Sequence, residues 1–430
     1  MGINRVVGFD FMRKQRDSKG SSDTLDVIRE KLLFSIADWD SCVTGVHLAA
    51  INPEGTAEAM LMALQNEPWA IDELDEYGRA PIHWAAEWGN LMILDVLIMA
   101  KANINLRSGI GNTPLVSSIS AGRQKATKRL LEVEECRMHI NSSNVGRFNL
   151  TALHYAINRN SPAIVRIVLE AGAMVKGCST YWSALYALGY FCREDQGTVD
   201  EIFGLLLTYG ADIEERDYLS GCTPIMSAVF MNNVLVLRTL ISAGASLTAL
   251  SPTNQNILHI MAVAVDVEIL DCIAKLDLVD VQVTQRTTDG YNALELLSEE
   301  YLQPFWKADA YCPRPSSAAM QAFIVFYFDL LIPEMRRHMS TIDALFRAVE
   351  DKDASTATRI LDQLVEKNVK CGEPDLVGWY RGLKGYVFGG DWNHLAGVLK
   401  EEYDETGEKI ERAKIARGKT ITDPEMEEFF

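Results

Sequence analysis

Short stretches of apolar residues with helical spacing recur along most of this chain. Two of the clearest stretches carry Leu91, Ile93, Leu94, Leu97 and Ile98, and Ile164, Val165, Ile167, Val168 and Leu169. Apolar residues that return every three or four positions line one face of an α-helix. Helices this short cannot bury their apolar faces alone, so the pattern predicts helix pairs that pack against neighbouring pairs.

A four-residue block opens each predicted helix pair, with a small or polar first residue and an apolar third residue. The eight blocks are Thr44-Gly-Val-His47, Ala80-Pro-Ile-His83, Thr113-Pro-Leu-Val116, Thr151-Ala-Leu-His154, Ser183-Ala-Leu-Tyr186, Thr223-Pro-Ile-Met226, Asn256-Ile-Leu-His259 and Asn292-Ala-Leu-Glu295. Their first residues are separated by 36, 33, 38, 32, 40, 33 and 36 positions. This regular period predicts repeated helix-turn-helix units over residues 41–300.

The residues expected at the helix ends fit the same units. In most blocks Thr, Ser or Asn comes first, where its side-chain oxygen can cap the helix, and Pro81, Pro114 and Pro224 follow at the first turn. We expect the first helix to stop at Gly89, Gly122, Asn160 and Asn232, and the second at Gly172, Gly210 and Gly244, with Lys101 replacing Gly in one unit. Gly and Asn are the residues that best tolerate the left-handed backbone that ends a helix.

The period near 33 residues and the Thr-Pro-Leu-His-like block resemble those of ankyrin repeats. Residues 41–300 carry the resemblance, which is strong in the second, fourth and sixth units and weak in the seventh and eighth. The resemblance implies an all-α solenoid of about eight helix-turn-helix repeats, with a count between seven and nine. It also implies that His47, His83, His154 and His259, which share one repeat position, hydrogen-bond locally and stabilise the turn.

The flanking segments predict caps and tails. Residues 1–20 form a polar tail, and residues 21–40 form a capping helix because Leu25, Ile28, Leu32, Leu33 and Ile36 have helical spacing within 22–38. Residues 301–316 contain three prolines and predict a linker, and residues 317–400 predict a helical C-terminal region with a hairpin over 343–364. Residues 401–430 are charge-dense and predict a charged tail that is either loosely amphipathic or disordered.

Composition and charge narrow the kinds of partner. The chain has 430 residues, and its formal net charge of −18 argues against nucleic acid and favours a basic or neutral protein partner. Its most apolar run, residues 318–332, is too short to span a bilayer and predicts a buried helix rather than membrane insertion. No secretory signal opens the sequence, so we expect an intracellular protein with reduced cysteines, with the cytoplasm slightly favoured over the nucleus.

The sequence offers no catalytic, metal or cofactor motif. Its eight cysteines are scattered singly, and His139, His338 and His394 have no Cys or Glu at metal-ligand spacing. The clustered glycines at 382–390 lack the Lys-Ser or Lys-Thr of a phosphate-binding loop. We therefore expect a non-enzymatic protein that requires no cofactor. The alternative is an enzyme or regulatory subunit whose activity lies in residues 301–430, with the repeats as a targeting arm.

The predicted partner-binding residues come from the repeat geometry. In ankyrin-like repeats the two residues before the stop of the first helix point toward a concave groove; here they are Glu87-Trp88, Ser120-Ala121, Asn158-Arg159, Tyr190-Phe191 and Phe230-Met231. Turn-tip residues Glu76, Tyr77, Arg107, Ile110, Tyr218 and Leu219 would extend this surface. Either the groove aromatics are exposed and form binding hot spots, or they pack against the next repeat. The predicted function is a scaffold or adaptor that binds a protein through groove and turn tips.

Overall fold

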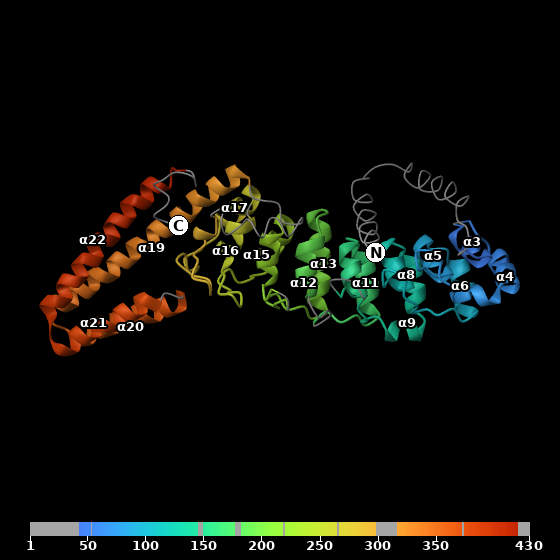
Figure 1. Cartoon of the computed structure of the whole chain (residues 1–430), viewed down its shortest axis with the longest axis horizontal. Helices are drawn as coiled ribbons and strands as arrows, with labels where there is room; N and C mark the ends of the chain where they lie inside the picture. The colour runs from blue at the N-terminus through green and yellow to red at the C-terminus, as the bar shows by residue number, and fades with distance from the viewer. Residues whose placement is uncertain are drawn as a thin grey trace. The chain divides into compact units, whose positions relative to one another are not determined.

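Figure 1 shows a computed structural model of the chain, which describes residues 43–52, 54–144, 149–176, 182–217, 220–264, 266–297, 316–371 and 374–419. Within these ranges the protein contains helices and turns but no β-strand. It divides into two compact units, residues 1–184 with 208–210 and residues 185–207 with 211–430. The predicted tail at 1–20, the predicted capping helix at 21–40 and nearly all of the predicted linker at 301–316 lie outside the described residues.

The first unit contains four pairs of short antiparallel helices. They are α3 (Gly45–Ile51) with α4 (Ala57–Asn66), α5 (Pro81–Trp88) with α6 (Leu91–Met99), α7 (Pro114–Ser120) with α8 (Gln124–Leu131), and α10 (Ala152–Asn158) with α11 (Pro162–Glu170). Two short helices, η2 (Pro68–Asp72) and α9 (Glu134–Met138), follow the first and third pairs. The first helix of each pair packs against the first helix of the next pair, in the order α3, α5, α7 and α10. The second helices α4, α6, α8 and α11 do the same, so consecutive pairs lie side by side as the repeat pattern predicts.

The second unit continues the same arrangement. Its helix pairs are α12 (Ala184–Phe191) with α13 (Gln196–Thr208), α14 (Pro224–Phe230) with α15 (Val234–Ser242), and α16 (Ile257–Ala264) with α17 (Val267–Ile273). The eighth block, which the sequence marks as weak, forms only the 3₁₀ helix η3 (Glu295–Leu297) within the described residues. The all-helical repeat fold is confirmed.

The predicted helix stops have the left-handed backbone that their residue types suggest. The φ angles are +74° at Gly89, +74° at Gly122, +55° at Asn160 and +50° at Asn232. At the ends of the second helices the φ angles are +97° at Gly172, +90° at Gly210, +83° at Gly244 and +66° at Lys101. The Lys at 101 therefore accepts a conformation that Gly adopts without steric cost.

The turn tips of neighbouring repeats touch through their backbones. The Gly109 N–H donates to the Gly78 carbonyl oxygen at 2.9 Å, and Thr288 N–H donates to Thr253 O at 3.0 Å in the second unit. A Cβ atom at Gly109 would lie 2.7 Å from the carbonyl oxygen of Tyr77. The tips of the second and third repeats can approach this closely only because residue 109 has no side chain.

Four longer helices follow the repeats: α19 (Ser317–Glu350), α20 (Ala354–Cys371), α21 (Pro374–Gly389) and α22 (Trp392–Ala416). Figure 1 shows α22 running beside α19 and α21 beside α20. They share an apolar core that includes Ile342, Leu361, Leu383 and Leu395. The hairpin predicted over 343–364 is present, because α19 ends at Glu350 and α20 begins at Ala354.

The C-terminal helices dock on the last repeat. The α19 helix packs against α16 and α17, and the Arg286 N–H donates to the carbonyl oxygen of Cys371 at the end of α20, at 3.0 Å. The thiol of Cys371 lies 3.0 Å from Oε1 of Gln282. These contacts join the ends of α19 and α20 to the repeat beside them.

As far as Ala416, the segment from residue 401 is amphipathic but neither loose nor disordered, so that part of the prediction is wrong. Helix α22 continues through this segment because Ile410, Ala413 and Ala416 form a buried stripe along it. The many charges lie on the opposite side and pair within the helix, as Lys409 does with Glu405 at 2.8 Å. At its end, the Gln321 side chain donates to the carbonyl oxygen of Lys419 at 2.7 Å.

Of the described helices, only α19 is long and apolar enough to cross a membrane, and 50% of its most apolar window is buried inside the protein. Phe323, Phe328 and Leu331 of the predicted run are buried, but the helix continues beyond residue 332 to Glu350, so the expectation that it is too short to span a bilayer is wrong.

The close approach of the turn tips gives a testable prediction. We expect Gly109→Ala to lower the free energy of unfolding by about 1–3 kcal/mol, because the new methyl group meets a backbone oxygen that cannot move aside. Gly204→Ala in α13 is the control, because a Cβ there meets nothing within 4 Å. Urea unfolding followed by circular dichroism measures both, and equal midpoints for the two variants would contradict this account of the tips.

Candidate functional site

The first residue of most blocks holds the start of its helix, but Ala80 has no side-chain oxygen to do so. The Thr44 hydroxyl accepts the His47 N–H at 3.3 Å, and the Thr113 hydroxyl accepts the Val116 N–H at 3.4 Å. The Thr151 hydroxyl lies 2.8 Å from Nδ1 of His154. Thr223 differs, because its hydroxyl is buried and has no hydrogen-bond partner among the described residues. The capping role predicted for Thr223 is thus wrong, although α14 still begins at Pro224.

The four repeated histidines bridge two parts of the chain. Each is fully buried, and its Nδ1 accepts the backbone N–H of the residue three positions earlier, at 3.1–3.3 Å. The other nitrogen, Nε2, lies 3.0–3.2 Å from a carbonyl oxygen 23 to 32 residues later in the chain: Arg79, Leu106, Trp182 or Tyr291. The local bond that the sequence predicts is present, and a second bond reaches the turn that leads to the next repeat.

These bonds require neutral imidazole rings. An Nδ1 that accepts a hydrogen bond cannot carry a proton, so the proton is on Nε2 and points at the carbonyl oxygen. Burial lowers the pKa of His83, His154 and His259 from the ordinary 6.5 to about 4. His83, His154 and His259 therefore act as fixed hydrogen-bonding links and are unsuited to taking up a proton near neutral pH.

The turn tips are held by buried side chains at their first positions. Oδ1 of Asp75 accepts the N–H groups of Tyr77 and Arg79 at 2.9 and 2.8 Å, while Oδ2 accepts the indole N–H of Trp84 at 2.8 Å. Asp217 repeats the pattern by accepting the Ser220 and Cys222 N–H groups at 2.9 and 3.1 Å. Each tip is therefore a rigid turn, and the side chains that it presents need little further ordering to bind a partner.

The predicted groove of the first unit is lined by paired charges. Glu87 forms an ion pair with Arg79 at 2.7 Å, and the Arg79 guanidinium lies 4.6 Å above the Trp84 ring. Arg123 of the next repeat donates through Nε to the Glu87 carbonyl oxygen at 2.9 Å. Arg159, one repeat further, is exposed. A carboxylate between arginines gives this surface both signs of charge.

The predicted groove aromatics are half-buried. This holds for Trp88 in the first unit and for Tyr190, Phe191, Phe230 and Met231 in the second unit. Tyr190 and Phe191 meet edge to face with ring centroids 5.0 Å apart. Each side chain is thus partly packed and keeps part of its surface exposed at the end of its helix. This result lies between the two alternatives that the sequence left open, full exposure in the groove and packing against the next repeat.

Buried polar atoms without partners gather at the same helix ends. Within the described residues, Nε1 of Trp88, Oγ of Ser120, and Oδ1 of Asn160 and Asn232 have no hydrogen-bond partner. All four residues belong to the ends of first helices, where the sequence places the groove. A buried polar atom without a partner costs about 1–3 kcal/mol.

The most exposed of the predicted apolar site residues are at the turn tips. Tyr77 is 51% exposed and Ile110 is 58% exposed, on the neighbouring tips of the second and third repeats. Glu76 is exposed beside Tyr77, and Arg107 is exposed although its guanidinium donates to the Gly111 carbonyl oxygen at 3.2 Å. Tyr218 and Leu219 lie outside the described residues.

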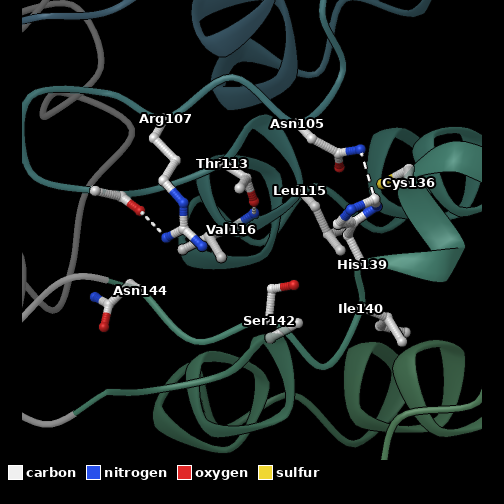
Figure 2. A pocket seen from close by; sticks show the side chains of 12 residues that line it. Asn105, Arg107, Thr113, Leu115, Val116, Cys136, His139, Ile140, Ser142 and Asn144 are labelled. Atoms are coloured by element: carbon white, nitrogen blue, oxygen red, sulfur yellow. Dashed lines mark hydrogen bonds between the residues drawn. The ribbon is translucent and has the colours of Figure 1, made fainter.

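A small cleft opens between the third and fourth repeats. Figure 2 shows Arg107, Thr113 and Asn144 on one side of it and Cys136, His139 and Ile140 on the other. Burial raises the pKa of Cys136 to about 12, which keeps its sulfur as an unreactive thiol. No group of three metal-ligating side chains occurs in the part of the chain that the structure describes.

Sequence reasoning missed two kinds of residue in this surface. Asp75 and Asp217 were not singled out, although an acidic residue five or six positions before a block could have indicated a capped turn. Arg123 follows directly after the stop at Gly122, and this position could have indicated a side chain that reaches back to the preceding repeat.

Comparison with known protein families agrees with the repeat pattern. A profile of three ankyrin repeat copies matches residues 101–179. A single ankyrin repeat profile matches residues 77–109 and 220–251. The matched residues fall in both units.

Several named proteins are similar to parts of the chain. Ankyrin repeat protein nuc-2 of Neurospora crassa is 32% identical over 234 residues, which cover 53% of this chain and 20% of that protein. The B-cell lymphoma 3 protein homolog of Mus musculus is 24% identical over 196 residues, which cover 43% and 41%. The chain therefore matches less than half the length of these relatives. The crystal structure of the human ASB11 ankyrin repeat domain has a TM-score of 0.43 and 23% identity, over 58% of this chain and 98% of that one.

The buried histidines predict a pH dependence of stability. The unfolded chain takes up protons near pH 6.5, whereas folded His83, His154 and His259 do so only near pH 4. The contribution of these rings to the free energy of unfolding is therefore fully present above about pH 6.5. It falls as the pH drops toward 4, by up to about 3 kcal/mol for each histidine.

Urea unfolding at pH 7.5 and at pH 5.0 tests this dependence. We expect the double variant His83→Gln/His154→Gln to be less stable than the unmodified chain at pH 7.5 but to lose less stability between the two pH values. The same loss in both proteins would show that these rings do not cause the pH dependence.

Proposed function

Because this chain is an ankyrin repeat-containing protein, we propose that it is a non-enzymatic scaffold or adaptor that binds a protein partner through its groove and turn tips. Ankyrin repeat domains are in general protein-binding modules. The observation that carries the proposal is the pair of exposed side chains Tyr77 and Ile110 on adjoining, rigidly held turn tips. Exposed aromatic and aliphatic side chains on a rigid surface are typical of binding hot spots.

The charge of this surface indicates the chemistry of the partner. Glu73 and Glu76 are exposed beside Leu74 and Tyr77, and the whole chain carries a net charge of −18. A partner segment with apolar side chains next to Lys or Arg would match this pattern. The unpaired polar atoms at the helix ends favour a partner that also offers backbone or side-chain hydrogen bonds in the groove.

The C-terminal helices support a binding role over an enzymatic one. Helix α19 packs on α16 and α17, and the four helices share an apolar core of their own, as helices that cover the end of a repeat array would. One half-buried polar cluster joins three of them: Nε2 of His338 lies 3.2 Å from the Tyr380 hydroxyl and 3.3 Å from Oε1 of Glu402. We interpret this cluster as a link between α19, α21 and α22. Intracellular location, with the cytoplasm slightly favoured, stays a prediction.

The proposal predicts which surface residues matter for binding. We expect Tyr77→Ala/Ile110→Ala in the full chain to raise the Kd for a partner more than tenfold, a loss of about 1.4 kcal/mol or more. The partner is first isolated with the unmodified full chain by proximity labelling and then purified, and its Kd is measured by titration calorimetry.

The control is Met92→Ala/Met99→Ala, which removes side chains that are 58% and 70% exposed on α6 of the second repeat. We expect this variant to bind as the unmodified chain does. Unchanged binding by the Tyr77/Ile110 variant, or equal losses in both variants, would reject the turn tips as the binding surface.

A further inference from the structure

Two arginines of the first unit reach back over the end of the first helix in the preceding repeat. An ideal Cβ atom at Gly89, which ends α5, would lie 3.0 Å from Cδ of Arg123 in the third repeat. An ideal Cβ at Gly122 in the third repeat would lie 2.8 Å from Nε of Arg159 in the fourth. The two stop glycines therefore leave room for these arginines because they carry no side chain of their own.

The two guanidinium groups keep most of their hydrogen-bond donors available. Nε of Arg123 donates to the Glu87 carbonyl oxygen at 2.9 Å, and this is the one hydrogen bond of that side chain within the described residues. The Arg159 side chain is exposed and forms no hydrogen bond or ion pair among the residues that the structure describes. Because a guanidinium has five N–H donors, nearly all donors of the pair remain available to a ligand.

The nearby carboxylate of Glu87 is already paired. It lies 2.7 Å from Nη1 of Arg79, whose guanidinium also lies over a tryptophan ring. Arg159 lies against Gly122, the residue directly before Arg123, so the two arginines are neighbours. Although the chain as a whole has a net charge of −18, this part of the groove presents two positive charges that no described carboxylate neutralises.

We propose that Arg123 and Arg159 bind the carboxylates of an acidic segment of a protein partner that lies in the groove of the first unit. The proposal rests on the proposed function and adds the chemistry of the groove to that of the turn tips. A guanidinium can donate two parallel hydrogen bonds to one carboxylate, and such charge-assisted bonds are stronger than neutral ones. Since Glu87 adds a negative charge beside the pair, singly charged Asp or Glu side chains fit better than a doubly charged phosphate group.

The contacts with the preceding repeat also prepare the two side chains for binding. A long side chain loses rotamer entropy when a partner fixes it. Arg123 is held by its bond to Glu87, and Arg159 is confined against Gly122, so part of this entropy is already lost on folding. The matching partner segment carries apolar and basic residues where it meets the turn tips and acidic residues where it enters the groove.

Selection of peptides against the purified full chain tests the proposal. The probe is a phage-displayed library of random peptides of about twelve residues. Each selected peptide is titrated against the unmodified chain, against the groove variant Arg123→Gln/Arg159→Gln and against the tip variant Tyr77→Ala/Ile110→Ala. Urea unfolding of each variant checks that it folds.

The matched control is Lys128→Gln/Arg166→Gln. It removes two positive charges from the same two repeats, at exposed positions on their second helices α8 and α11. The control and the groove variant therefore change the net charge equally. A nonspecific effect of charge would weaken binding to both, whereas direct recognition weakens binding to the groove variant alone.

We expect a class of peptides that contain Asp or Glu and whose Kd rises more than tenfold for the groove variant but less than twofold for the control. Exchange of the acidic residue for Lys should abolish binding to the unmodified chain, and Arg159→Glu should restore binding of that Lys peptide. The proposal is overturned if no selected peptide depends on the two arginines, if the dependent peptides lack acidic residues, or if the control loses as much affinity.

The tip variant separates this proposal from the proposed function. Peptides that depend on Tyr77 and Ile110 but not on the arginines would keep the turn tips as a binding surface and would overturn acidic recognition in the groove. Peptides that depend on the arginines alone would support the groove and would count against the tips.

Discussion

Each helix pair in this protein is folded because the pairs beside it cover its apolar faces. A seven- to nine-residue helix is too short to be stable in water by itself, and a pair of them buries little surface. Leu94, Leu97 and Ile119 are completely buried in the stacked array, in which each helix packs against its counterpart in the next pair. The stability of such a structure is a sum over neighbouring pairs, so the ends of the array decide whether the sum is favourable.

Directional contacts then fix how each pair meets the next. The neutral histidines join the start of one first helix to the turn that follows it, and the tip glycines allow backbones of adjacent repeats to hydrogen-bond. Both contacts tolerate little displacement because they are short, and the histidines are also buried. The apolar contacts supply most of the stability, while the hydrogen bonds set the register of neighbouring turn tips, as the bond from Gly109 to Gly78 does.

The sequence predicted the features that depend on single residue types at regular spacing. Helix starts at Pro81 and Pro224 and stops at Gly89 and Asn160 follow from local backbone preferences, which do not require knowledge of the neighbouring repeat. The carbonyl oxygens that accept from the histidines are 23 to 32 residues away, and a local pattern cannot identify them. The exposure of Trp88 depends on the side chains of the next repeat, so sequence alone left it open. Helix α22 was missed beyond residue 400 because its charges suggested disorder, although they pair along one side of the helix.

The return of α22 along α19 has a consequence for the geometry of the C-terminus. Helix α19 has 34 residues, about 51 Å, and carries the chain away from the last repeat, whereas α22 brings it back until Lys419 meets Gln321 near the start of α19. A fluorophore or affinity tag attached just after residue 419 would thus be anchored near the base of the four-helix region. Energy transfer from that attachment point would monitor the junction with the repeats and would be insensitive to bending at the distal hairpins.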